Sequence, residues 1–263
     1  MAERFFVADQ LAPGPYTLTG PEAHHLTHVC RVRAGAKVVL FNGDGHEYPA
    51  AVIRTSRTEA ELDVFAHRLV DRELPFPLIV ACPLPKGDRC QFLLEKLTEL
   101  GATAFVPLET ERTVVHPGEG KVEKLRRYVI ESAKQCGRNR LMEIKTPEKW
   151  SSFAQNADVS TMRCLADPTG KPLSFSPRPG TPGRGVGGEG PVFDGCEPLT
   201  PNPSPRSTGA RGVIVAIGPE GGWSEKELTS GDEAGWLKVC LGPRILRMET
   251  AAIAVVAALS IDN

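Results

Sequence analysis

Two stretches of the sequence share one layout, in which an apolar β-forming run ends at a Gly-Pro step and a helix is expected soon after. The first stretch is IGPEGGWSEKEL, residues 217–228, and the second is LGPRILRMETAA, residues 241–252. A plain turn needs one or two glycines, whereas Gly218, Gly221 and Gly222 cluster in the first stretch alone. Because glycine allows another molecule to touch the main chain, this layout predicts a ligand against the backbone.

The two junctions are expected to meet, since ligands of open α/β sheets bind beyond the carboxyl ends of the strands. They would then line one pocket, with Arg244, Arg247 and Glu249 crowded at the second junction. Each junction taken alone is also compatible with a glycine-rich turn followed by a helix cap. The arginines are likewise compatible with a solvent-exposed helix face. No Gly-Lys-Ser/Thr sequence follows the glycines, which argues against a phosphate-binding P-loop.

After residue 72, apolar runs alternate with helical patterns, which predicts an α/β domain with a mostly parallel sheet and helices on its faces. The expected strands are 77–82, 103–108, 162–166, 213–217 and 237–241, and the expected helices are 88–101, 123–137, 251–261 and one that begins at 224. Asp88 is expected to cap the first helix and Gly101 to end it. Ser224 and Glu227 form a second predicted capping box, and Thr250 or Glu249 is expected to cap the last helix.

Residues 1–72 are predicted to form a small β-barrel, because several short β-forming runs follow one another there. Residues 42–45, NGDG, separate two of these runs and predict a hairpin, since Asn, Asp and Gly tolerate positive φ. Residues 73–263 form the second predicted domain. Its segment 172–211 holds 9 prolines and 8 glycines in 40 residues and is expected to be a disordered insertion. The G-x-G-x-x-G spacing inside it lacks a flanking strand and helix, so a dinucleotide site is not expected there.

The overall composition indicates an ordinary globular protein of 263 residues with a formal net charge of −1. A role in nucleic-acid binding must therefore rest on a local basic patch. The seven cysteines include no Cys-x-x-Cys pair, which favours a reducing compartment over a disulfide framework or a zinc site. No signal peptide and no membrane-spanning run are recognised, so a cytoplasmic location is expected and a membrane partner is not.

Two further clusters consist of polar and charged residues. The stretch ESAKQCGRNR, residues 131–140, is interpreted either as a solvated helix end or as a contact with RNA phosphates. His24 and His28 lie four residues apart, yet no second ligand cluster accompanies them, so no metal site is expected. Arg31 and Arg33 nearby would meet RNA or simply water.

Together these stretches, with KGDRCQFLLEKLTELGATAFVPLETERTVV at residues 86–115, resemble the ribosomal RNA small subunit methyltransferase E family over nearly the whole chain. The two Gly-Pro motifs in tandem are the most specific part of this resemblance, and the Pro/Gly-rich insertion departs from the family pattern. The resemblance implies a small PUA-like β-barrel that binds RNA and a SPOUT α/β domain with a deep trefoil knot. It also implies a homodimer, S-adenosylmethionine as methyl donor, and N3 of a uridine in the 16S rRNA of the small ribosomal subunit as acceptor.

Carried onto this sequence, the resemblance implies three sets of residues. The cofactor is expected to contact Leu165, Ala166, Ile217, Gly218, Pro219, Glu220, Gly221, Gly222, Leu241, Gly242, Arg244, Ile245, Leu246, Arg247, Thr250 and Ala251. RNA is expected to contact Arg31, Arg33, Lys86, Arg112, Lys134, Arg138 and Arg140.

For catalysis, Arg247, with Arg138 as the rival, is expected to stabilise the anion that uracil forms when N3 loses its proton. Glu249 or Glu220 is expected to take that proton or to orient an arginine. Two other functions remain open. A non-catalytic RNA-binding module would keep the fold without affinity for the methyl donor. A nucleotide-phosphate enzyme is disfavoured by the missing Lys-Ser/Thr pair.

Overall fold

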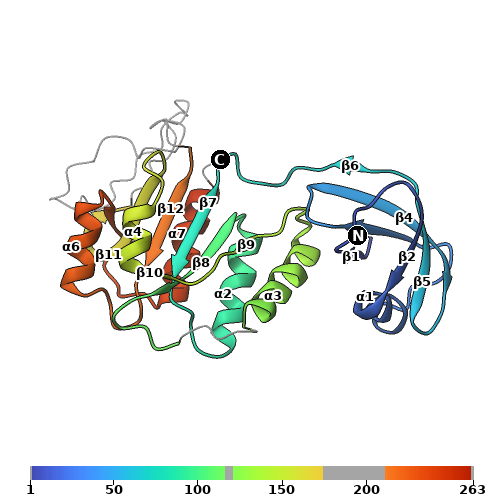
Figure 1. The fold of residues 1–263 in the computed structure, drawn as a ribbon, viewed down its shortest axis with the longest axis horizontal. Coiled ribbons are helices and arrows are strands. Elements are labelled where there is room, and N and C mark those ends of the chain that lie inside the picture. The colour runs from blue at the N-terminus through green and yellow to red at the C-terminus, as the bar shows by residue number, and fades with distance from the viewer. Residues whose placement is uncertain (1, 116–120, 174–210, 262–263) are drawn as a thin grey trace, which may run out of the picture.

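The structure is a computed structural model that describes residues 2–115, 121–173 and 211–261. It contains two β-sheets, each with its own hydrophobic core, and the chain passes from the first sheet to the second through an extended segment after β6 (Figure 1). The predicted insertion lies almost wholly outside the described residues, and so does the G-x-G-x-x-G spacing within it.

The N-terminal sheet has the strand order β1-β3-β4-β5-β2, with β6 paired to β4. Its elements are β1 (Arg4–Phe6), β2 (Gly14–Thr19), α1 (Gly20–His24), a π-helical turn (His25–Val29), β3 (Lys37–Phe41), β4 (His46–Thr55), β5 (Glu59–Val64) and β6 (Arg68–Leu69). Alternate side chains of β4 and β5 face the core, and Leu26 of the π-helical turn packs into it, fully buried. The predicted hairpin is confirmed, because β3 and β4 pair antiparallel on either side of residues 42–45.

The C-terminal sheet has the order β10-β8-β7-β12-β11-β13, with β9 paired to β8, and every pairing in it is parallel. Its strands are β7 (Leu78–Cys82), β8 (Ala104–Glu109), β9 (Glu143–Ile144), β10 (Glu148–Lys149), β11 (Met162–Pro172), β12 (Val213–Ile217) and β13 (Leu237–Cys240). The interior strands β7, β8 and β12 read as continuous apolar runs because helices cover both faces of the sheet.

The helices divide between the two faces of this sheet. They are α2 (Asp88–Glu99), α3 (Lys121–Cys136), α4 (Trp150–Asn156), α6 (Glu225–Glu233) and α7 (Met248–Ile261). Helices α2 and α7 pack together over one face with α3 outside α2, and α4 and α6 cover the other face with the three tryptophans (Figure 1). Figure 1 also shows α3 on the side of the C-terminal domain that faces the N-terminal sheet.

The predicted helix ends are partly correct. Ser224 and Glu227 form the predicted capping box at the start of α6, and Gly101, with φ +89°, follows the last turn of α2. Two caps were wrong: Gly87 precedes α2, so Asp88 is its first residue, and α7 already begins at Met248, which places Glu249 and Thr250 inside the helix. Strand β11 runs beyond the predicted 166 and shifts its register against β13 between Ala166 and Lys171.

Candidate active site

Both Gly-Pro junctions line one cavity, where β12 and β13 end and β11 changes register. The residues that line it are Ala166, Asp167, Pro168, Ile217, Gly218, Pro219, Glu220, Gly222, Trp223, Val239, Cys240, Leu241, Gly242, Arg244, Ile245, Leu246, Met248 and Ala251. Strand β11 pairs with both β12 and β13, so the ends of all three strands come together at this point. The sequence prediction that the two junctions share one pocket is therefore confirmed in its geometry.

In the first junction, Gly218 directly follows β12 and lies against the indole of Trp223. A Cβ on Gly218 would lie 2.9 Å from the indole nitrogen, closer than side chains approach in proteins, so a residue with a side chain does not fit there without a shift. The same indole N–H donates a hydrogen bond of 3.0 Å to the carbonyl of Ala166. Trp223 thus ties the junction after β12 to the turn of β11 and forms one wall of the cavity.

The second junction turns at Gly242, whose φ of +106° is open to glycine and strained for other residues. The thiol of Cys240 donates to the carbonyl of Gly242 at 3.2 Å across this turn. The main-chain groups of Ile245 and Leu246 form no hydrogen bond with the described part of the chain, and both residues line the cavity. An apolar cavity with free main-chain donors and acceptors suits a flat heterocycle such as adenine, which can be bound through its edge.

A second cavity adjoins the first and is far more charged. Its lining consists of Lys86, Arg89, Val114, Glu220 and Arg247. Glu220 lines both cavities and therefore marks the boundary between them. Arg89, from the first turn of α2, places Nη1 3.5 Å from Oε1 of Glu220 and 3.5 Å from Oε1 of Glu249.

Most residues of the predicted cofactor set line the first cavity, and four do not. Leu165 is fully buried in the core beside it, and Gly221 lies against the side chain of Arg112. Thr250 is exposed on α7, and Arg247 lines the second cavity. Six lining residues were missed: Asp167, Pro168, Trp223, Val239, Cys240 and Met248. Trp223 could have been predicted, because it is an aromatic residue directly after the glycines. Asp167 and Pro168 could not, because they line the cavity through the register shift of β11, which no local sequence pattern predicts.

The structure separates the predicted catalytic residues. Arg247 is exposed at the second cavity and has no ion-pair partner among the described residues. Glu249 is buried, lines neither cavity, and lies behind Arg89; its Oε2 atom has no hydrogen-bond partner in the described part of the chain. Glu220 is the carboxylate that faces the second cavity. Arg89 was not in the predicted catalytic set, although the neighbouring residues alone place it in the first turn of the helix that follows Gly87.

Arg138 was wrongly predicted to contact RNA or the reacting base. Its side chain is 4% exposed and forms an ion pair with Glu73, while its Nη1 donates to the carbonyls of Thr98 and Ala102 at 2.9 and 3.0 Å. These carbonyls lie just before β8 begins, at the opposite end of the sheet from the cavity. Because the side chain is buried and four of its five N–H donors bond Glu73, Thr98 and Ala102, the guanidinium is committed to the fold and not presented to a substrate.

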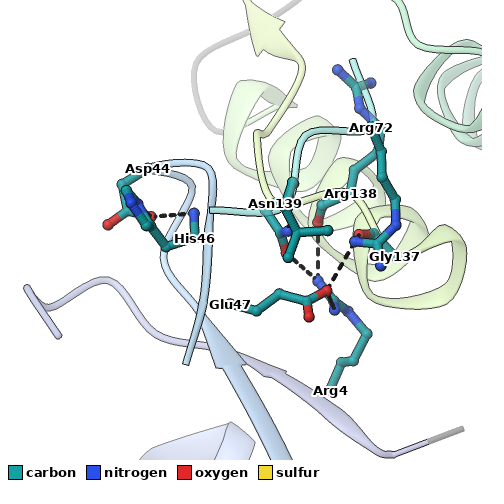
Figure 2. Close-up of polar contacts among 9 residues, drawn as sticks. Arg4, Asp44, His46, Glu47, Arg72, Gly137, Arg138 and Asn139 are labelled. Carbon is teal, nitrogen blue, oxygen red and sulfur yellow. Dashed lines mark hydrogen bonds and ion pairs between the residues drawn. The ribbon is translucent and has the colours of Figure 1, made fainter. Parts of the chain in front are cut away.

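The rest of the stretch 131–140 joins the two domains (Figure 2). Arg4 of β1 donates to Oδ1 of Asn139 at 2.6 Å and to the carbonyl of Arg138 at 3.3 Å. Glu47 accepts hydrogen bonds of 2.8 Å from both Arg4 and Arg72, and Arg72 also donates to the carbonyl of Gly137. This set, which we call the junction network, consists of Arg4, Glu47, Arg72, Gly137, Arg138 and Asn139.

Lys134 belongs to the same contact and was also wrongly predicted as a free phosphate-binding cation. Its side chain is 9% exposed, and Nζ lies 3.0 Å from Glu22 of α1 and 3.2 Å from Glu131. Among the other predicted RNA contacts, Arg31, Arg33, Lys86 and Arg140 are exposed. Arg112 is exposed as well but donates to the carbonyl of Gly221 at 2.5 Å, where it supports the glycine junction.

His24 and His28 stack with ring centroids 4.6 Å apart at the end of α1. Within the residues described, no group of three or more His, Cys, Asp or Glu side chains is placed to hold a metal ion. None of the described helices combines the length and the apolar character that crossing a membrane requires.

Comparison with known families identifies both parts of the chain. A model described as an RNA methyltransferase domain matches residues 72–186 and 197–260, and a model described as an RNA methyltransferase PUA domain matches residues 18–65. The chain is 32% identical over 252 residues to ribosomal RNA small subunit methyltransferase E of Synechocystis sp., covering 95% of this chain and 75% of that protein. It is 29% identical to the protein of the same name from Bacillus subtilis, covering 98% of this chain and 96% of the relative.

Two solved structures share the whole architecture. A methyltransferase from Legionella pneumophila, solved in complex with S-adenosylmethionine, is 28% identical with a TM-score of 0.80, covering 98% of this chain and 97% of that one. A ribosomal RNA small subunit methyltransferase E from Neisseria gonorrhoeae, bound to S-adenosyl methionine, is 26% identical with a TM-score of 0.80 and the same coverage. The predicted fold class, a PUA-like domain followed by a SPOUT-type α/β domain, is confirmed, and the trefoil knot stays a prediction.

Proposed function

This chain belongs to the ribosomal RNA small subunit methyltransferase E family, and we propose that it transfers a methyl group from S-adenosylmethionine to N3 of a uridine in 16S rRNA. The observation that carries the proposal is the meeting of both Gly-Pro junctions in one apolar cavity, with a charged cavity directly beside it. The first cavity suits the cofactor and the second suits the base. The relatives solved with S-adenosylmethionine support the choice of cofactor.

The residues of the first cavity fit the cofactor on chemical grounds. Ile245 and Leu246 offer free main-chain groups to the adenine edge, and Gly222 and Gly242, both at positive φ, keep side chains out of the cavity. When bound, S-adenosylmethionine supplies a methyl group on a positively charged sulfur, and its transfer breaks the sulfur–carbon bond, forms a carbon–N3 bond and leaves a neutral thioether. The protein then has to hold the base in line with that methyl and to manage one proton.

Glu220 is the residue that we assign to the N3 proton. N3 of uracil carries this proton at neutral pH and must lose it to attack. Since Glu220 lines both cavities, its carboxylate lies at the boundary that the reacting nitrogen has to reach. Arg247, exposed on the same cavity, faces the negative charge that spreads to the carbonyl oxygens of the base and stabilises it. Glu249 does not line this cavity, so it acts through Arg89.

The N-terminal domain supplies further RNA contacts in this proposal. Arg31 and Arg33 are exposed cations of this domain, and Lys86 and Arg140 are exposed cations of the C-terminal domain. All four can follow the phosphate backbone, so binding weakens as salt rises. A homodimer in the cytoplasm completes the proposal and rests on the family resemblance.

Primer extension on 16S rRNA tests the proposed reaction, because a methyl group at N3 blocks base pairing. We expect rRNA from cells that lack this protein to give a new stop at one uridine after incubation with protein and S-adenosylmethionine together. Omitting either component should remove the stop. Calorimetric titration with S-adenosylmethionine separates the alternative, since a non-catalytic RNA-binding module would bind rRNA without binding the cofactor.

A further inference from the structure

The charged cavity has an arrangement of donors and acceptors that suits the edge of a base better than a phosphate. Three cations, Lys86, Arg89 and Arg247, line it together with the carboxylate of Glu220. A phosphodiester carries its negative charge on the two non-bridging oxygens and has no N–H or O–H to donate, so the carboxylate would repel it. A neutral base that presents one N–H between two carbonyl oxygens suits both the carboxylate and the cations.

Arg89 is held in this cavity by two acidic side chains from different parts of the chain. Its Nη1 atom faces Glu220 of the first Gly-Pro junction and Glu249 of α7, at 3.5 Å from each. The side chain of Glu249 is 7% exposed, and its other carboxylate oxygen, Oε2, has no hydrogen-bond partner among the described residues. A buried carboxylate needs a counter-charge, so Glu249 favours the position of Arg89 seen here. A guanidinium has five N–H donors, which leaves Nε and Nη2 available to a ligand.

We propose that Arg89 is a specificity-determining residue that donates to a carbonyl oxygen of the acceptor base, and that Glu249 is its positioning residue. This inference rests on the proposed function. In it, Arg89 contacts one carbonyl of uracil, Arg247 contacts the other, and Glu220 accepts the N3 proton between them. Cytosine presents an amino group in place of O4 and a lone pair in place of the N3 proton. It would therefore set a donor against a cation and an acceptor against a carboxylate.

The inference is tested by combining a single-atom change in the substrate base with a substitution of Arg89 in the protein. RNA that carries the target uridine as 2-thiouridine or 4-thiouridine replaces one carbonyl oxygen by sulfur, a weaker acceptor. The ratio of kcat/KM for uridine to that for each thio base is measured for the wild type and for Arg89→Met. Because the thio base changes its own acidity for every variant alike, only the change of the ratio between proteins counts.

We expect one of the two ratios to fall roughly ten- to a hundred-fold in Arg89→Met, since a hydrogen bond from a charged donor is lost there. The other ratio should stay unchanged, and the affected position identifies the oxygen that Arg89 contacts. Arg126→Met is the matched control, because Arg126 is an exposed arginine on α3 that pairs only with Glu123 among the described residues. It should keep both wild-type ratios.

Glu249 needs variants of its own because Arg89→Met alone leaves a buried charge uncompensated. The double variant Arg89→Met/Glu249→Gln removes both charges and should show the same ratios as Arg89→Met in a folded protein. Glu249→Gln alone should lower the affected ratio part of the way, while calorimetry shows unchanged affinity for S-adenosylmethionine. Arg89→Lys keeps the charge and should retain part of the ratio.

The outcomes distinguish this inference from the reaction itself. A wild type that methylates its uridine, with ratios identical to those of Arg89→Met at both positions, overturns the role of Arg89 and leaves the proposed function standing. A wild type that binds rRNA but methylates no uridine overturns the proposed function, and the role of Arg89 is overturned with it.

Discussion

Arg138 and Arg247 show at the scale of the residue how surroundings decide the role of one chemical group. Both are arginines in stretches that carry the family resemblance. Arg138 is almost fully buried, with Glu73 and two carbonyls around it, whereas Arg247 is exposed at the charged cavity without an acidic partner among the described residues. The first guanidinium therefore supports the fold, and the second is free to meet a substrate.

Replacing these two arginines by alanine should have opposite effects. Arg138→Ala leaves Glu73 without its counter-charge and should lower the free energy of unfolding by about 3–5 kcal/mol, as for other broken buried pairs. Arg247→Ala should change it by less than about 0.5 kcal/mol, as for exposed sites, but should reduce the methylation rate. Urea denaturation and single-turnover methylation measure the two effects. An Arg247→Ala protein with the wild-type methylation rate would contradict its assigned role.

Gly218 makes a second prediction at this scale. An added Cβ would lie 2.9–3.1 Å from three atoms of the Trp223 indole, so Gly218→Ala should displace the indole from the carbonyl of Ala166 and weaken binding of S-adenosylmethionine. Gly235→Ala is the matched control. Gly235 has a φ of +75° after α6 and does not line the cavity, so alanine should cost about 1 kcal/mol of stability through strain without loss of affinity. Calorimetric titration and thermal unfolding compare the two. Equal affinity in both variants would refute the role of this contact.

At the scale of the element, the start of α6 depends on one carboxylate that serves two segments. Glu227 accepts from the main-chain N–H of Ser224 at 2.9 Å and from that of Glu111 at 2.9 Å. Among the described residues, the hydroxyl of Ser224 accepts a hydrogen bond only from the N–H of Glu227, within the same cap. The cap thus also fixes the segment after β8 that carries Arg112 to the glycine junction.

Ser224→Ala should lower the free energy of unfolding by about 1 kcal/mol, the usual effect of losing an N-cap. Glu227→Ala should cost more, because the buried N–H of Ser224 and the partly buried N–H of Glu111 both lose their acceptor, and a buried donor left unsatisfied costs about 1–3 kcal/mol. Hydrogen exchange of the Glu111 amide locates the difference: it should become faster in Glu227→Ala and stay protected in Ser224→Ala. The reverse order of the two stability losses would show that the serine carries the cap.

The helix α6 also shows which features a sequence can predict. A capping box and an apolar strand are encoded by neighbouring residues, so β12 and the start of α6 were placed correctly. The start of α7 was placed too late, because Glu249 and Thr250, which the sequence offers as caps, lie inside the helix that begins at Met248. The register shift of β11 was missed because it depends on pairing with β13, which is far away in the sequence.

At the scale of the whole molecule, two hydrophobic cores meet through a polar contact. The junction network brings Arg4 to Asn139, residues 135 positions apart, and a second contact joins Lys134 to Glu22. From the sequence, the basic residues of 131–140 were interpreted as a solvated helix end or as an RNA contact, because their acidic and amide partners lie in other elements. The assignment of the cavity succeeded since both junctions follow parallel strands, whose carboxyl ends share one edge.

Breaking the junction network should separate the unfolding of the two domains. Trp150, Trp223 and Trp236 all lie in the C-terminal core, so tryptophan fluorescence reports that domain alone, whereas far-UV circular dichroism reports both. The two probes should give one coincident urea transition for the wild type and two displaced transitions for Arg4→Met. Arg54→Met, which removes an exposed arginine paired with Glu61, should keep them coincident. Displaced transitions in the wild type would show that the network does not couple the domains.

The contribution of Glu47 to this network should depend on pH in a defined direction. Burial opposes ionisation of Glu47, but hydrogen bonds from Arg72 and Arg4 outweigh it and hold its pKa below the ordinary value of 4.5. A carboxylate whose pKa is lower in the folded state stabilises that state fully above its unfolded pKa and loses this contribution as the pH falls through its folded pKa. The difference in free energy of unfolding between the wild type and Glu47→Gln should therefore be constant between pH 7 and about pH 5 and shrink below pH 4.5. Urea titrations at a series of pH values measure it. A difference that stays constant or grows as the pH falls below 4 would mean that the two arginines do not stabilise the ionised carboxylate.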